Sequence, residues 1–216
     1  MTYLELVNSV LRRLREREVP SVDATAYSKL IGMLVNDAKR EVEDAWEWSA
    51  VRDTLTATTT DGTFSYVLTG AGNRPTVLNV LNDTTNVVMQ YRSAEWFTKQ
   101  YLLPDAVEEG APVYYSFNGQ DAFGDTIMEF YPKPDAEYLV RINLVLRTPD
   151  LANDGDEVYV PNHVVSQLAF AKAIEERGED GGIASSSAYA TAQRSLADAI
   201  SLDASKHPEE ILWQEV

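Results

Sequence analysis

The two ends of the chain carry apolar residues at every third or fourth position, which is the spacing of one face of a helix. Four such residues begin the first stretch: Leu4, Val7, Leu11 and Leu14. Thr2 and Glu5 have the Thr-x-x-Glu spacing of a capping box, so we expect this helix to begin there and to end before Pro20. A second pattern runs to Trp46 with Asp23 as its candidate cap, and the short connection predicts two antiparallel helices.

After these helices, apolar and polar residues begin to alternate, as they do in strands with one buried face. The clearest strand is predicted at 137–147, where Val140 and Ile142 share one side and Arg141 takes the other. A short helix is predicted at 93–103.

A tight turn is predicted near the start of this region. The Thr-rich stretch 54–68 alternates in the same way and has Asp61-Gly62 at its centre. Because this dipeptide supplies the positive φ angles of a tight turn, the stretch predicts a β-hairpin.

Helical spacing returns at Pro161, which suits the first turn of a helix because that turn needs no N–H from it. The pattern stops at Gly178 and resumes from about Ala184 to Lys206, where His207-Pro208 ends it.

The predicted fold class is therefore α+β, with an antiparallel β-rich layer inserted into a helical bundle. The helix pairs of the bundle come from residues 1–48 and 161–206. The β-rich layer spans 49–160, and an extended C-terminal arm spans 207–216.

The net charge of the chain limits which classes of function it can have. The 216 residues include 34 Asp and Glu against 18 Lys and Arg, a formal net charge of −16. DNA-binding proteins depend on cationic contacts to phosphate, so this surface would repel a duplex rather than hold it. With no Cys, disulfides and thiolate metal sites are excluded. No apolar run approaches the roughly 20 residues of a membrane span, and we expect a soluble protein made in the cytoplasm.

Catalytic motifs are missing from the sequence. It has no phosphate-binding loop, no nucleophile elbow and only two histidines, His163 and His207. We therefore predict no catalytic residue, metal or cofactor, and no enzymatic activity. One alternative stays open, because 34 acids leave room for a carboxylate pair of the kind that hydrolyses glycosides.

The tryptophans suggest contact surfaces. Trp46 and Trp48 lie where helix gives way to strand, and we predict that they seal the junction of bundle and sheet. The arm carries Ile211, Leu212 and Trp213 among acids. Such an apolar segment either docks into a groove of a neighbouring protein or folds back on its own bundle.

Several stretches resemble a family of bacteriophage virion proteins, and the resemblance covers nearly the whole chain. The most specific are the Trp-x-Trp after the second helix, "GAPVYYSFNG" at 110–119, and "YPKPD" at 131–135 leading into a strand and a Val-Pro helix start. The chain is similar to the head-to-tail adaptor of short-tailed phages, called tail tubular protein A.

This resemblance implies a structural virion protein at the head-to-tail interface. Such adaptors form a ring, usually of twelve copies, between the portal and the tail nozzle, and DNA passes through the channel without specific binding. The arm residues Ile211, Leu212 and Trp213 would then reach the portal. The loops that would contact the nozzle are the Asp61-Gly62 turn and residues 118–125, with Asn118, Gly119 and Phe123.

Three other functions remain as alternatives at this point. They are a tail enzyme that degrades polysaccharide, another phage neck or tail-completion protein, and a cellular scaffolding module.

Overall fold

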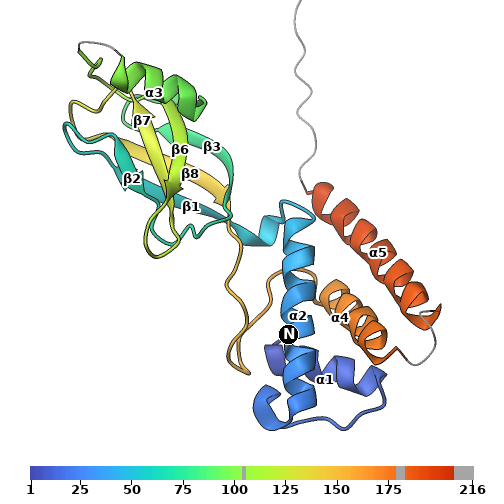
Figure 1. Cartoon of the computed structure of the whole chain (residues 1–216). Helices are drawn as coiled ribbons and strands as arrows, with labels where there is room; N and C mark the ends of the chain where they lie inside the picture. Colours follow the sequence, from blue (N-terminus) through green and yellow to red (C-terminus); the bar gives the residue numbers. More distant parts are fainter. Residues whose placement is uncertain (104–105, 179–182, 207–216) are drawn as a thin grey trace, which may run out of the picture. The chain divides into compact units, whose positions relative to one another are not determined.

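The computed structural model describes residues 1–103, 106–178 and 183–206, shown in Figure 1. The chain divides into two compact units. The helical unit combines Met1–Ala50 with the chain from Thr148 onward, and the β unit is Val51–Arg147. Most of the helices belong to the helical unit and both sheets belong to the β unit, so the predicted α+β class is confirmed.

The helical unit has its core between α-helices from both ends of the chain. These are α1 (Tyr3–Arg13), α2 (Ala26–Asp44), α4 (Asn162–Arg177) and α5 (Ile183–Ala204). Helix α4 packs against α2 on one side and α5 on the other, as Figure 1 shows. Val10, Ile31, Val35 and Val165 are fully buried in this core.

Side-chain caps set where the first two helices begin. The predicted capping box is confirmed: the Glu5 N–H donates to the Thr2 hydroxyl at 3.3 Å, and the Thr2 N–H donates to the Glu5 carboxylate at 2.9 Å. The predicted Asp23 cap is wrong. A 3₁₀ turn occupies Val22–Ala24, and the hydroxyl of Thr25 accepts from the Ser28 N–H instead.

Helices α1 and α2 are not antiparallel neighbours as predicted. Figure 1 shows α1 lying across one end of α2. The reason is that α1 ends at Arg13, well before Pro20, which leaves a long connection. Asn8 holds that connection, since its amide donates to the Val19 carbonyl and accepts from the Val19 N–H.

A buried ion pair attaches the chain to α2 as it returns from the β unit. Lys39 Nζ lies 3.1 Å from the Glu43 carboxylate, and their side chains are 0% and 1% exposed. The same ammonium donates to the carbonyls of Thr148 and Pro149 at 2.9 and 3.0 Å. Glu43 in turn accepts from the Thr148 hydroxyl. The returning segment is thereby bonded to two successive turns of the helix.

The β unit contains two four-stranded sheets. The first has the order β1 (Arg52–Thr58), β8 (Leu139–Val145), β3 (Thr76–Asn82), β4 (Val87–Val88). The second has the order β2 (Ser65–Val67), β7 (Thr126–Tyr131), β6 (Tyr114–Gln120), β5 (Gln90–Tyr91). Neighbours are antiparallel except β5 and β6, which are parallel, so the purely antiparallel layer predicted from the sequence is wrong in this detail.

The predicted faces of the long strand are confirmed. In β8, Val140, Ile142 and Leu144 are fully buried while Arg141 is exposed. These residues meet Met128 of the second sheet in one apolar cluster.

The predicted hairpin at 54–68 is wrong. A turn does form at Asp61-Gly62, where Gly62 has φ +76°. The strands on either side separate, however, because β1 pairs with β8 and β2 pairs with β7. The alternation of polar and apolar residues in this stretch is compatible with a hairpin and also with pairing to distant strands. The local pattern therefore could not show that the turn connects two sheets.

Helix α3 (Ala94–Leu102) covers part of the second sheet through aromatic contacts, and the Ser93 hydroxyl caps the helix by accepting from the Trp96 N–H. Trp96 lies 5.1 Å from the ring centres of both Tyr114 and Tyr131. Tyr101 donates to the Phe130 carbonyl, and burial raises its pKa strongly.

Candidate assembly surfaces

The loop between β6 and β7 presents an exposed aromatic ring on a rigid support. The Asp121 carboxylate accepts from the N–H groups of Phe123 and Asp125 at 2.8 and 2.9 Å. Gly124 takes the left-handed conformation, φ +88°, that the turn requires. Phe123 at the apex is 93% exposed. A large apolar side chain held in water by a preorganised loop is typical of a contact anchor.

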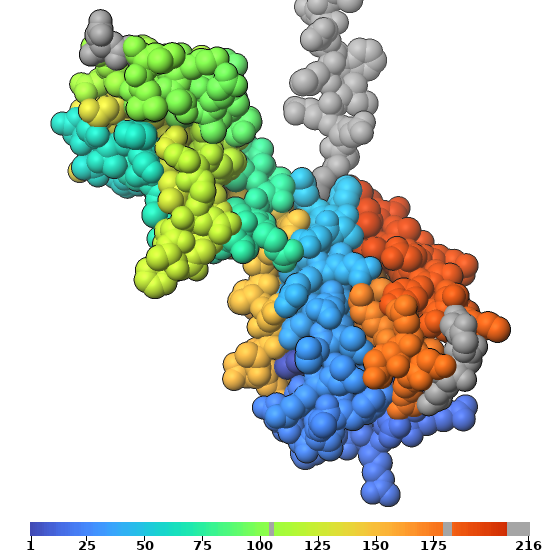
Figure 2. All heavy atoms as spheres, in the orientation of Figure 1, coloured from blue at the N-terminus to red at the C-terminus, as the bar shows by residue number. Residues whose placement is uncertain are grey.

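A second loop is bonded to this one and stiffens it. The Asp125 carboxylate accepts from the N–H groups of Gly70 and Gly72 at 3.1 and 2.9 Å. The Gly72 carbonyl accepts from both the N–H and the hydroxyl of Thr126. We call residues 68–75 together with 121–126 the tip surface. Figure 2 shows the β6–β7 hairpin, coloured yellow-green, protruding from the β unit.

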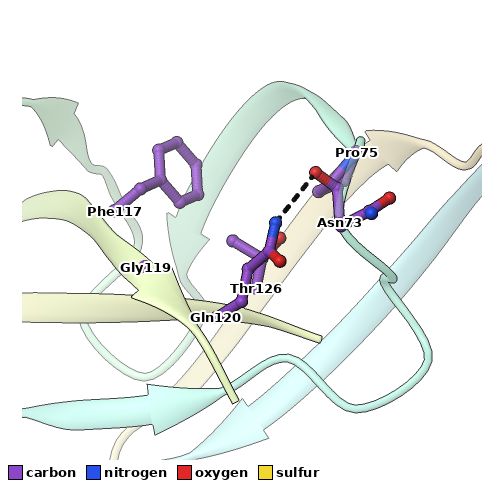
Figure 3. A pocket seen from close by; sticks show the side chains of 6 residues that line it. All are labelled: Asn73, Pro75, Phe117, Gly119, Gln120 and Thr126. Atoms are coloured by element: carbon purple, nitrogen blue, oxygen red, sulfur yellow. Dashed lines mark hydrogen bonds between the residues drawn. The ribbon is translucent and has the colours of Figure 1, made fainter. Parts of the chain in front are cut away.

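An open groove of about 450 Å³ runs along the tip surface (Figure 3). Its lining is Asn73, Pro75, Phe117, Gly119, Gln120 and Thr126. Gln120 donates to the Asn73 carbonyl at 3.4 Å, the contact that the dashed line marks. Apart from Phe117 and Pro75 the lining is polar or glycine, which suits the rim of a protein contact better than an enclosed ligand site.

Two residues predicted for this loop belong to a strand instead. Asn118 and Gly119 lie within β6, at the point where its pairing with β7 shifts register. The Asn118 amide donates across to Glu129 at 2.6 Å. Their Asn-Gly sequence resembles a turn, but here it marks an irregularity in the ladder, and only Phe123 lies at the apex.

The other predicted contact loop lies at the opposite end of the sheet. The Gly62 N–H donates to the Pro134 carbonyl at 2.8 Å, just beyond the C-terminal end of β7. Phe123 precedes the N-terminal end of that strand, which at six residues is about 20 Å long. The structure therefore does not bring Asp61-Gly62 and Phe123 into one surface.

Trp46 and Trp48 are both bonded within the helical unit. Trp48 is 2% exposed and its indole N–H donates to the Val42 carbonyl at 2.6 Å. The indole N–H of Trp46 donates to Asp203 on α5 at 3.2 Å. Contact of either ring with the β unit stays a prediction.

Asp203 is a key residue that the sequence analysis missed. Besides Trp46, its carboxylate accepts from the N–H and hydroxyl of Ser49 and from Lys206 Nζ. Burial alone raises the pKa of this carboxyl group, but the hydrogen bonds from Ser49 and Lys206 outweigh burial and hold the pKa well below its usual range. Asp203 thus fixes the C-terminal end of α5. One acid in a helix of an acidic chain gives no sequence signal for this role.

The predicted portal-contact residues Ile211, Leu212 and Trp213 lie outside the described residues. Their role stays a prediction.

In the part of the chain that the structure describes, no group of three or more His, Asp or Glu residues could hold a metal ion. Carboxylates of the acidic stretch 153–157 accept hydrogen bonds from backbone N–H groups. Asp154 accepts from Val22, and Asp156 accepts from Ala152 and Asn153. Among the same residues, none of the helices is both long and apolar enough to span a bilayer.

These features describe an α+β protein with an exposed aromatic side chain on a hydrogen-bonded loop, an arrangement that is common in proteins that assemble with others. The chain belongs to the SU10 adaptor protein family, whose model matches residues 1–210. This membership supports the role of a phage head-to-tail adaptor, a structural component of the virion. No curated protein matches the chain.

Proposed function

We propose that this protein is a ring-forming adaptor that joins the portal of a phage head to the tail nozzle and lines part of the DNA ejection channel. The family match over residues 1–210 carries the proposal. The resemblance of the chain to tail tubular protein A supports the finer assignment to a short-tailed phage, a ring of twelve copies and a position in the neck.

The charge of the chain suits a channel that DNA crosses. At −16 per copy, a ring would surround the duplex with carboxylates, which bind phosphate poorly. Part of that charge must face the lumen for this effect. DNA would then pass without specific binding.

Each of the two units would have its own role in assembly. The bundle of N- and C-terminal helices would form the ring through a head-to-tail interface between copies. The inserted β layer would contact the nozzle, and the arm with Ile211, Leu212 and Trp213 would contact the portal.

We assign the nozzle contact to the tip surface, with Phe123 as its anchor. The Phe123 ring is 93% exposed and its loop needs no rearrangement before binding. Asp61-Gly62, at the other end of β7, would contact a different neighbour or serve as a turn only.

The first test is whether the purified chain, alone or with its portal, forms rings in negative-stain images. Rings support the adaptor; a protein that stays monomeric in the presence of the portal contradicts it.

The second test separates the tip surface from the rest. Phe123→Ser should weaken binding to the nozzle protein of the same phage at least tenfold, because truncating an anchor costs about 2 kcal/mol or more. Val88→Ser, which changes another exposed apolar residue of the β unit (63% exposed), is the matched control and should bind normally. Equal binding by both variants would remove Phe123 from the contact.

A further inference from the structure

An apolar groove of about 250 Å³ lies on the helical unit beside the C-terminal end of α5. Trp48, Tyr159, Pro161, His163, Leu202 and Lys206 are among its lining residues. All of them belong to the helical unit. The volume lies below the roughly 300–1,000 Å³ of pockets that enclose small molecules. It is suited to one or two side chains instead.

Large apolar side chains border this groove in water. Tyr159 is 61% exposed and Leu202 is 71% exposed, whereas Trp48, which also lines it, is only 2% exposed. Exposed apolar groups next to a buried aromatic surface favour binding of another apolar group, because each Å² removed from water contributes about 25 cal/mol.

The chain itself supplies a segment of the right chemistry at the right place. Lys206 lines the groove and is the last described residue, and ten residues follow it. Ile211–Trp213 is the apolar stretch among them. Only four residues, 207–210, separate this stretch from Lys206, so the apolar stretch lies within reach of the groove along the chain.

Charges around the groove permit this approach. Glu209 and Glu210 precede the apolar stretch, while Lys206, with its ammonium group, lies in the groove lining. Asp203 also lines the groove, but its carboxylate is already bonded to Ser49 and Lys206. Its negative charge is therefore compensated locally and does not repel the glutamates strongly.

We propose that this groove binds the segment Ile211–Trp213 of its own chain. The contact covers the exposed Tyr159 and Leu202 as well as the apolar part of the arm. A partner protein that binds the arm must then compete with the groove. The apparent affinity of that partner is the intrinsic affinity multiplied by the fraction of arms that are not docked. The groove contact does not depend on ring formation or on the portal, so its test uses the isolated protein.

The absence of Cys from the sequence allows a direct test by disulfide trapping. Ala50 lines the groove and Gln214 follows the apolar stretch, so the variant Ala50→Cys/Gln214→Cys keeps Trp48, Leu202 and Ile211–Trp213 intact. A disulfide requires Cα atoms within about 7 Å. The full-length variant, dilute and under mild oxidation, should form an intramolecular disulfide.

The matched control is Glu47→Cys/Gln214→Cys. Glu47 is exposed like Ala50 and lies two residues before Ser49, which Lys206 contacts at 3.3 Å, but it is not among the residues that line the groove. Random collisions of the arm should reach both sites equally. We expect the groove pair to react at least tenfold faster, and Trp213→Ser in the groove pair to abolish the difference.

Three results would overturn the proposal. The first is equal rates for the two pairs, and the second is a groove rate unaffected by Trp213→Ser. The third is disulfide-linked dimers whose yield rises with protein concentration, which would make a second copy the source of the segment.

Discussion

The helical unit and the β unit join distant parts of the chain by different physical means. In the helical unit, α2 is attached to the returning chain by polar contacts: Asn36 exchanges hydrogen bonds with the backbone of Leu151, and Lys39 bonds to two carbonyls. In the β unit, the ten buried members of the central cluster are all hydrophobic and come from both sheets and the segments that connect their strands.

This difference reflects how distant segments are aligned with one another in each unit. Strands are aligned by their ladders, so an apolar core between two sheets needs no further specification. An irregular segment that lies on a helix has no ladder. Its buried carbonyls need donors, and Lys39 and Asn36 supply them at defined points along α2.

The largest expected effect is that of Lys39→Met on the helical unit. The change leaves Glu43 buried without its cation and removes the donor to two carbonyls, which should lower the free energy of unfolding by about 3–5 kcal/mol. Chemical denaturation measures the loss, and hydrogen exchange should place it in α2 and residues 148–151.

Two variants check this explanation. Arg40→Met, at the residue after Lys39, breaks only exposed ion pairs, those with Asp37 and Asp150, and should leave stability nearly unchanged. The double change Lys39→Met/Glu43→Met should recover part of the loss, since no unpaired charge remains but the two carbonyls still lack their donor. A single variant as stable as the wild type would mean that the ion pair does not hold the returning chain.

A somewhat smaller effect is expected in the β unit from Ile142→Ala. Ile142 is fully buried between the sheets, and the cavity left should cost about 3 kcal/mol. Leu139→Ala, in the same strand but at a side chain 41% exposed, is the matched control and should cost much less. Backbone amides should lose protection from hydrogen exchange in the β unit alone. Equal loss in α2 would show that the two units unfold together.

The smallest effect is expected from the carboxylate of Asp203, and it depends on pH. Its folded-state pKa lies below the value of about 3.9 in an unfolded chain, so the stability it contributes is complete above about pH 5 and is lost as pH falls. Asp203→Asn should cost about 2 kcal/mol at pH 7. The gap between wild type and variant should narrow between pH 5 and pH 3, as thermal unfolding at each pH would show. A constant gap would mean that the charge of Asp203 is not what stabilises α5.

Several structural features that depend on neighbouring residues were predicted correctly from the sequence. The Thr2–Glu5 box, the end of α4 at Gly178 and the two faces of β8 all appear as expected. Each depends on residues within a few positions of one another, so the local pattern contains the necessary information. The predicted pairing of β1 with β2 was wrong because each strand pairs with a partner much farther along the chain, about 90 and 60 residues away.

The candidate site was predicted only in part for the same reason. Phe123 lies at the apex of its loop, but Asn118 and Gly119 belong to β6, and Asp61-Gly62 lies at the far end of β7. Asp203 was missed because its partners, Trp46 and Ser49, are more than 150 residues away.

By itself the sequence determined the alternation of helix and strand, several of the helix ends and the acidic charge, since composition and neighbouring residues decide these properties. The tertiary structure alone decided which strands pair, which acids are buried with partners, and which apolar side chains face water. Burial depends on segments that meet only after folding. The groove beside Lys206 is formed by three such segments, and no local pattern in any of them predicts it.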